Sequence, residues 1–368
     1  MPPHMIKQGL ILLVLGVIVA TSSFWFGRRS AENTPLVFTD AGTVAADVSP
    51  TISINNRLRG EVAWTETDRV FDLALDPLGQ KLFSSYVNPK APYEAGVRVS
   101  EAATGKLIRS QVVEGSGIYR LALSAEANIV ATGSDGSCGD DRINVLELPA
   151  LKRRWIQWGK LDSYPVSSLA VSSQAQLLAS TGTTQIRLWN LRDGSPRLVI
   201  EGQATGRPWR NLPQDTQEGF LALAFRPDGG ILVAGGTGGI TLWQVSDGRL
   251  LRRWAPEQSI SALTLCPSGQ RAAIETADGI ALYQLSDGVK LWQHTLPSGR
   301  MPLSFAFTRD GRLVSGGRGN DKVSIWRAKD GALLQQLPSP LGKIYRVTTS
   351  ADGRQVVASC EKGLVAWR

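Results

Sequence analysis

One pattern of strands and turns recurs seven times between Asp68 and Arg368. Each copy reads as a short apolar strand, a tight turn, a strand of small residues, and an alternating strand that ends on a large side chain. The clearest copy runs from Phe220 to Trp243 and contains the turn Arg226-Pro-Asp-Gly229. A period of roughly 40 to 50 residues built from strands alone is typical of a propeller or a related repeat array. The repeat therefore constrains the fold far more than it constrains the function.

A fourth strand completes each repeat. Turns containing Asp-Gly follow several of the third strands, and an outward strand such as Arg249–Trp254 follows the turn. The sequence predicts an all-β, seven-bladed β-propeller with four-stranded blades. The predicted blades cover about 68–116, 117–163, 166–202, 218–254, 259–296, 302–340 and 343–368.

One aromatic residue closes the third strand in five of the repeats. A large flat side chain at one fixed place in each unit is suited to packing one blade against its neighbour. The second strands are rich in small residues, which suits a crowded inner layer. The predicted blade-packing aromatics are Trp189, Trp243, Tyr283, Trp326 and Trp367.

The last repeat lacks its outer strand, because Arg368 follows its third strand directly. An unmatched strand at 57–65 precedes the first repeat and has the basic, alternating character of the outer strands. A bare strand edge invites pairing with other chains. We therefore expect 57–65 to complete the seventh blade and close a propeller that spans 57–368.

An apolar segment without charge occupies residues 9–26, between Lys7 and Arg28. As a helix it would rise roughly 27 Å, close to the hydrocarbon thickness of a bilayer. We predict a single-pass transmembrane helix and signal anchor, after a tail at 1–8 and before a linker at 27–56. A cleaved secretory signal and a buried helix are the alternatives. Flanking charges nearly balance, and we favour the exocytoplasmic side, periplasmic or lumenal, for the propeller.

Composition restricts the chemistry that is open to this chain. The formal charge of +8 is modest for 368 residues, and no nucleic-acid motif is present, so no nucleic-acid partner is expected. The three cysteines, Cys138, Cys266 and Cys360, fall in separate repeats and do not suggest a disulfide framework. Two histidines leave little material for a metal site or a catalytic triad. No catalytic residue, cofactor or metal is predicted.

The longest insertion between blades, 202–219, carries the candidate interaction residues Arg207, Trp209 and Arg210. A tryptophan between two arginines has the composition of an interaction hot spot. The alternative is that Trp209 folds back on a blade as a cap.

Two further features each have two interpretations. The acidic run 135–141 could gather around Ca²⁺, but it lacks EF-hand spacing, and a polar hairpin loop is the plainer explanation.

Basic residues on outer strands could form a girdle for an anionic partner, or they could protect strand edges from pairing, which we favour. These residues are Arg57, Arg59, Lys106, Arg109, Lys152, Arg153, Arg154, Arg197, Arg249, Arg252, Arg253 and Lys290.

The aromatic positions and the turn Arg226-Pro-Asp-Gly229 resemble those of WD40 propellers, over about 57–368. Two features depart from that family. No Gly-His pair opens a repeat, and the residue after the aromatic is not aspartate. The positions after the aromatic hold Asn190, Gln244, Gln284 and Arg327. The hydrogen-bond network Asp–His–Ser/Thr–Trp of the family is therefore not expected, and apolar packing should carry more of the stability.

The resemblance implies a non-catalytic scaffold for protein–protein interaction. Together with the apolar segment, it predicts a membrane-anchored propeller whose partners are unidentified proteins and, through 9–26, the lipid bilayer. The alternative is an exported propeller that binds or hydrolyses a small molecule, quinoprotein-like or lactonase-like. Segments 103–106 and 286–292 resemble quinoprotein docking motifs, but the vicinal cysteine pair of the quinoprotein dehydrogenases has no counterpart here.

Overall fold

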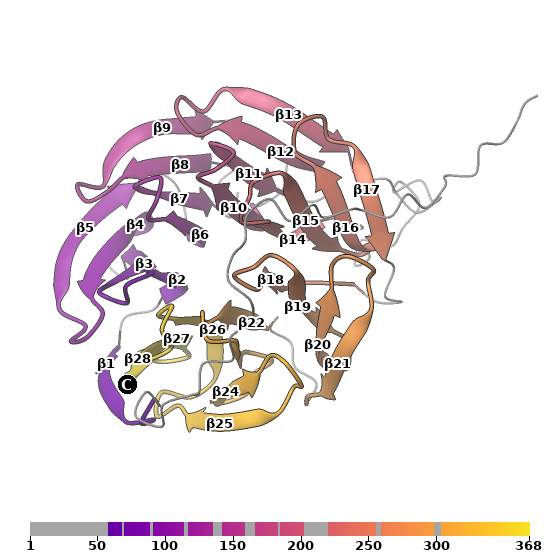
Figure 1. Cartoon of the computed structure of the whole chain (residues 1–368). Coiled ribbons are helices and arrows are strands. Elements are labelled where there is room, and N and C mark those ends of the chain that lie inside the picture. Colours follow the sequence, from indigo (N-terminus) through magenta and orange to yellow (C-terminus); the bar gives the residue numbers. More distant parts are fainter. Residues whose placement is uncertain are drawn as a thin grey trace, which may run out of the picture. The chain divides into compact units, whose positions relative to one another are not determined.

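A computed structural model describes residues 58–67, 70–88, 91–113, 117–134, 142–158, 166–182, 185–201, 220–254, 259–297 and 303–368. Within these ranges the chain forms seven antiparallel sheets of four strands each, and no helix. The sheets follow one another around a ring (Figure 1). The structure confirms the all-β, seven-bladed propeller that the repeat predicts.

Strand order within a blade follows the chain from the centre outward. Blade 1 consists of β2 (Val70–Leu75), β3 (Lys81–Asn88), β4 (Ala91–Glu101) and β5 (Leu107–Val113). Blade 2 consists of β6 (Ile118–Ser124), β7 (Ile129–Ser134), β8 (Arg142–Glu147) and β9 (Lys152–Trp158). Blade 3 consists of β10 (Ser168–Ser172), β11 (Leu177–Thr181), β12 (Gln185–Asn190) and β13 (Pro196–Glu201).

The remaining blades repeat this order, except that blade 7 takes its outer strand from the N-terminal side. Blade 4 consists of β14 (Phe220–Phe225), β15 (Ile231–Gly236), β16 (Gly239–Gln244) and β17 (Leu250–Trp254). Blade 5 consists of β18 (Leu263–Leu265), β19 (Arg271–Thr276), β20 (Gly279–Gln284) and β21 (Lys290–Thr295). Blade 6 consists of β22 (Ser304–Phe307), β23 (Arg312–Gly316), β24 (Lys322–Arg327) and β25 (Leu333–Pro338). Blade 7 consists of β26 (Ile344–Thr349), β27 (Val356–Cys360), β28 (Gly363–Trp367) and β1 (Val62–Glu66).

The apolar core lies between blades, and the third-strand aromatics are part of it. Trp189 packs among blade 2 residues such as Ile143, and Trp326 among blade 5 residues such as Leu282. Trp243 and Trp367 likewise pack on blades 3 and 6, and Tyr283 on blade 4. Each of these aromatics therefore fills the space between its own blade and the preceding one.

Three of these tryptophans also donate a hydrogen bond from the indole nitrogen to a hydroxyl. Trp189 Nε1 donates to Ser180 Oγ, and Trp326 Nε1 donates to Ser315 Oγ, both at 2.8 Å. Trp243 Nε1 donates at 2.8 Å to Thr241 Oγ1, two residues earlier on its own strand. The expectation that the family network is absent is thus wrong for its Ser/Thr–Trp part. This part needs neither histidine nor aspartate.

Trp367 is an exception among the third-strand tryptophans. Its indole nitrogen is buried and has no hydrogen-bond partner within the described part of the chain. Strand register explains the difference, because Ala358 takes the place that serine holds in blades 3 and 6. Val365, two residues before Trp367, takes the place of the blade 4 threonine. Trp367 is therefore held by apolar packing.

A second set of tryptophans joins four of the seven outer strands to the next blade. Each Nε1 donates to a backbone carbonyl oxygen in the turn between the third and fourth strands of the neighbouring blade. The four pairs are Trp64 to Ala102 at 2.8 Å, Trp155 to Leu191 at 2.9 Å, Trp254 to Asp287 at 3.3 Å, and Trp292 to Ala328 at 2.9 Å. Segments 103–106 and 286–292, which resemble quinoprotein docking motifs, lie at these contacts.

The glycine of each turn leaves room for the indole of the preceding blade. A Cβ built on Gly194 would lie 2.7 Å from Trp155 Cδ2, closer than real carbon atoms approach. Gly194 also has a φ of +73°, which favours glycine. The Asp-Gly turns of the sequence thus serve packing between blades as well as chain reversal.

Strand β1 closes the ring by pairing with β28 on the outer edge of blade 7 (Figure 1). The register places Val62 opposite Trp367 and Thr65 opposite Val365. The strand is shorter than the predicted 57–65, because Gly60 has a φ of +79° and interrupts the extended chain. Leu58 is buried in the core between blades 6 and 7, so this one segment contacts both blades.

The predicted tail, transmembrane helix and linker, which together span 1–56, lie outside the described residues. Among the described residues, no helix is long and apolar enough to cross a membrane.

Deletion of residues 1–67, which removes Leu58 and β1, should lower Tm by roughly 10 °C or more. The reason is that blade 7 loses its outer strand together with the buried Leu58 and the Trp64 contact with blade 1. Thermal unfolding followed by circular dichroism measures the change. A matched deletion of residues 1–57 keeps β1 and should leave Tm close to that of the intact chain. Equal Tm values for the two deletions would contradict closure by this strand.

Gly194→Ala should destabilise the fold more than Gly319→Ala. Both glycines have a φ of +73°, so the backbone strain of roughly 1–2 kcal/mol is shared. Only Gly194 faces an indole, because a Cβ on Gly319 would meet nothing within 4 Å. Chemical denaturation of both variants gives the difference in unfolding free energy, which isolates the contact with Trp155. Equal losses would show that the indole contributes nothing.

Candidate functional site in the central channel

The first strand of every blade lines the centre of the ring. Residues from all seven inner strands and the positions just before them enclose a cavity of about 350 Å³. This volume lies at the lower end of the range of small-molecule sites, roughly 300–1,000 Å³. The cavity is therefore the natural place to look for chemistry that the fold presents.

One equivalent position in each blade, on the inner strand or directly before it, lines this cavity. An apolar residue follows this position in every blade. These positions hold Asp72, Arg120, Ser168, Ala222, Ala262, Ser304 and Arg346. The three charged residues come from blades 1, 2 and 7, which are consecutive around the ring. Charge is thus concentrated on one side of the channel.

Asp72 is fixed between the two arginines by backbone hydrogen bonds. Its Oδ1 accepts a hydrogen bond from the Leu73 amide at 3.0 Å, and its Oδ2 accepts one from the Leu121 amide of blade 2 at 2.8 Å. Arg346 Nε lies 3.7 Å from Asp72 Oδ1, and both side chains are largely buried. The carboxylate therefore joins two blades and also compensates positive charge.

Arg120 lies on the other side of Asp72 and donates from Nε to the carbonyl oxygen of Ser167. Removal of its guanidinium from water and repulsion by Arg346 outweigh attraction by Asp72, and together they lower the pKa of Arg120 to about 10. The lowered pKa of Arg120 thus reflects burial of the guanidinium first and the neighbouring Arg346 second.

Two serines, at the positions in blades 3 and 6 that are equivalent to Asp72, join neighbouring blades through hydrogen bonds. Ser168 Oγ accepts a hydrogen bond from the Leu223 amide of blade 4, and Ser304 Oγ accepts one from the Val347 amide of blade 7, both at 3.1 Å. No histidine lies in the described wall of the channel to activate these hydroxyls. Within the described residues, no group of three His, Cys, Asp or Glu could hold a metal ion.

A buried ion pair joins blades 5 and 6 beside the channel. Arg318 Nε lies 2.9 Å from Glu275 Oε1, and the two side chains are 9% and 8% exposed. Glu275 Oε2 also accepts hydrogen bonds from Ser261 Oγ and from the Leu303 amide. No local sequence signal predicts this pair, because its partners are 43 residues apart and neither belongs to a recognised motif.

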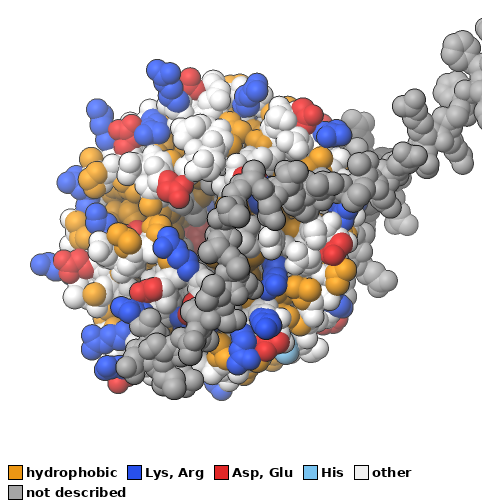
Figure 2. Space-filling view, viewed as in Figure 1, with side chains coloured by type: hydrophobic (Ala, Val, Ile, Leu, Met, Phe, Trp, Pro, Cys, Tyr) orange, Lys and Arg blue, Asp and Glu red, His pale blue; other side chains and the backbone are white. Residues whose placement is uncertain are grey.

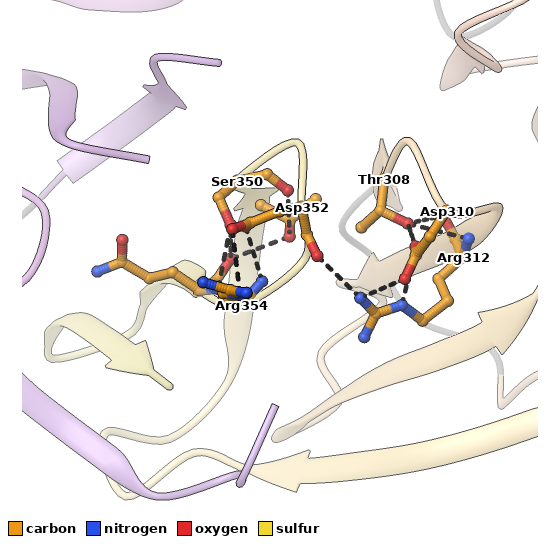
Figure 3. A network of polar contacts seen from close by, with 8 residues as sticks. Thr308, Asp310, Arg312, Ser350, Asp352 and Arg354 are labelled. Carbon is orange, nitrogen blue, oxygen red and sulfur yellow. Dashed lines mark hydrogen bonds and ion pairs between the residues drawn. The ribbon is translucent and has the colours of Figure 1, made fainter. Parts of the chain in front are cut away.

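The turns after the inner strands form a polar network on the edge of blades 6 and 7 (Figure 3). Thr308, Asp310 and Arg312 belong to one turn, and Ser350, Asp352 and Arg354 belong to the next.

Arg312 joins the two turns of this network. It pairs with Asp310 at 2.7 Å and donates at 3.1 Å to the carbonyl oxygen of Asp352 (Figure 3). Burial opposes ionisation of Asp352, but hydrogen bonds from Ser350 and the Arg354 amide hold its pKa below the ordinary value. These groups stabilise neighbouring turns.

Positive charge on the outer strands is spread and mixed with negative charge (Figure 2). Arg154 Nε lies 3.0 Å from Glu147 Oε1, and Arg98 Nη1 lies 3.1 Å from Glu66 Oε1. Figure 2 shows Lys and Arg side chains around the edge of the ring, with Asp and Glu side chains among them. This distribution favours protection of strand edges over a continuous basic girdle.

Several residues selected from sequence lie outside the described part of the chain. Arg207, Trp209 and Arg210 fall within 202–219, and the acidic run 135–141, which includes Cys138, is also outside it. Cys266 and Cys360 are both free thiols. Burial raises the pKa of the Cys360 thiol, which favours its neutral, unreactive form.

Comparison with known proteins agrees with the geometry of the fold. No family model matches the chain. The β-propeller domain of Cps50 (Swd1) from Myceliophteria thermophila superimposes with a TM-score of 0.67 and 17% identity, covering 83% of this chain and 98% of that one. This likeness agrees with the seven-bladed β-propeller fold of the chain.

Two curated proteins are similar in sequence to part of the propeller. They are telomerase protein component 1 of Rattus norvegicus and of Mus musculus, each 25% identical over 199 residues. The match covers 54% of this chain but only 7% of either relative. The similarity therefore concerns a small part of two much longer proteins.

Proposed function

We propose that this WD40-like propeller is a membrane-anchored, non-catalytic scaffold for protein–protein interaction. The proposal rests on the polar side chains near the centre of the ring, which form hydrogen bonds between blades. Asp72, Ser168, Ser304 and Glu275 all form hydrogen bonds between neighbouring blades. Groups committed in this way hold a rigid ring together, and a rigid ring suits the display of loops to a partner.

The outer surface offers apolar contacts in addition to the loops. Exposed apolar side chains lie on the outer strands of blades 1, 5 and 6 or directly before them. These are Leu107, Ile108, Val112, Val289, Leu291, Leu333 and Leu334. Exposed apolar side chains on several blades favour an outer surface that binds other proteins.

The anchoring part of the proposal depends on residues 9–26, whose length and lack of charge suit a bilayer. Deletion of 1–26 should move the protein from the membrane fraction to the soluble fraction of a cell lysate. Protease treatment of intact cells should digest a propeller on the exocytoplasmic side. Recovery of the intact chain in the soluble fraction would contradict anchoring.

Trp209→Ala should weaken the affinity for the partner by about thirtyfold or more, because a hot-spot tryptophan contributes about 2 kcal/mol or more. Crosslinking in intact cells followed by mass spectrometry identifies the partner, and pull-down of that partner measures the loss. Arg354→Ala is a matched surface control, since its side chain is 64% exposed and far from the 202–219 insertion in sequence. Tm of Trp209→Ala should be unchanged. A large fall in Tm with capture intact would favour the cap instead.

A further inference from the structure

We propose that the outer strand of blade 1, β5, binds a second copy of this chain by pairing edge to edge with β5 of that copy. The two strands run antiparallel about a two-fold axis, as in an isologous dimer. This inference goes beyond the scaffold function and does not depend on it, since it uses neither the 202–219 insertion nor residues 9–26. It rests on the exposure of β5, on its free backbone edge and on the order of its side chains.

Strand β5 is the most exposed of the described outer strands. It lies on the outside of blade 1 (Figure 1), and among the described strands it pairs with β4 alone. Six consecutive residues, Leu107 to Val112, are exposed, and only Val113 is buried. No other described outer strand has more than two exposed residues in a row. A long exposed strand edge is a template for a further strand.

The other outer strands carry residues that oppose such pairing. Lysine, arginine and proline on an edge strand discourage contact with another sheet. The outer strands of blades 2 to 5 contain Lys or Arg, among them Arg154, Arg197, Arg253 and Lys290. Strand β25 of blade 6 ends on Pro338, which has no N–H, and β1 of blade 7 contains Glu66.

The edge of blade 1 lacks this protection. Its strand β5 contains one charged residue, Arg109, and no proline. Arg109 Nη1 donates at 3.4 Å to the carbonyl oxygen of Ala150 on blade 2. The cation is therefore directed to the neighbouring blade of its own molecule, and the apolar residues Ile108 and Val112 remain 51% and 46% exposed.

The backbone of β5 has hydrogen-bonding groups left for another strand. Residues of an antiparallel pair alternate between those that bond to the partner strand and those whose groups point away. The Glu101 amide of β4 donates to the carbonyl oxygen of Lys106, so every second residue of β4 before Glu101 faces β5. The partners of these residues are Arg109 and Gln111, which therefore bond to β4. The N–H and C=O groups of Ser110, between them, point away from the sheet.

The order of side chains along β5 is complementary to its own reverse. In an antiparallel pair centred on Ser110, Ile108 of each copy faces Val112 of the other, and Arg109 faces Gln111. Apolar pairs directly opposite each other stabilise a sheet, and like charges directly opposite destabilise it. This register therefore places two apolar pairs around a small central residue and opposes no like charges. The self-complementary order identifies a second copy as the occupant.

The size of the contact determines how it is best detected. Strand β5 has seven residues, whereas a standard protein interface has roughly 20–30 residues a side. Association through this edge is therefore weak and depends on concentration. Covalent trapping detects such a contact more reliably than measurement of molecular size.

Ser110→Cys in the full-length chain tests the pairing. Two residues that exchange hydrogen bonds in an antiparallel pair have Cα atoms about 5.5 Å apart, within the range of disulfides. Oxidation of intact cells with copper phenanthroline should link the two introduced thiols, and mass spectrometry of the linked peptides identifies the site. Gln336→Cys is the matched control, since it occupies the equivalent position on blade 6 and is also exposed. It should give about tenfold less linked dimer, because its thiols are not aligned.

Ile108→Lys, added to Ser110→Cys, tests the register. The two-fold axis places the new charge opposite Val112 at both ends of the pair, so the yield of linked dimer should fall about tenfold, to the level of the Gln336→Cys control. Leu334→Lys is the matched change on blade 6, at the position equivalent to Ile108 and 43% exposed, and should leave the yield unchanged. Both substitutions lie on exposed positions, so Tm should stay close to that of the unaltered chain.

Three outcomes would overturn the proposal. The first is an equal yield of dimer from Ser110→Cys and Gln336→Cys, in which the native cysteines are the same. The second is a dimer of Ser110→Cys whose yield Ile108→Lys does not change. The third is a disulfide from the introduced thiol to a different protein in place of the dimer, which would assign the edge to a strand of another partner.

Discussion

A single four-stranded blade would leave both of its faces in water, so the fold depends on contact between neighbouring blades. That contact occurs at three distances from the centre. Near the channel, side chains such as Asp72 and Ser304 accept hydrogen bonds from the next inner strand. Midway, the third-strand aromatics pack on the preceding blade. At the outer edge, tryptophans such as Trp155 donate to a turn of the following blade. Each blade is thereby held on both sides.

These contacts also determine what the molecule can do. Polar groups near the channel, among them Asp72, Ser168 and Ser304, form hydrogen bonds between neighbouring blades. The similarity to the Swd1 propeller concerns architecture, so the functional argument depends on this chain's own side chains.

Sequence alone predicts most of the fold, because the features that define a blade are local. Asp-Gly turns, small-residue strands and a closing aromatic such as Trp243 all lie within one repeat. The pairing of β1 with β28 follows from counting strands. Side-chain contacts between repeats were harder to predict, because Trp155 meets a carbonyl 36 residues away and Arg318 meets Glu275 at a distance of 43. An alignment of the inner strands would have predicted that Asp72, Arg120 and Arg346 lie at equivalent positions near the channel.

The pairing of Val62 with Trp367 has a consequence for biosynthesis. On the ribosome β1 emerges before the other described strands, whereas its partner β28 emerges after all of them. During translation the early strand must remain unpaired while six blades form behind it. Contacts so distant in sequence slow folding, and they leave the edge of blade 7 unpaired until both strands have been made. The ring therefore closes only after β28 has been made.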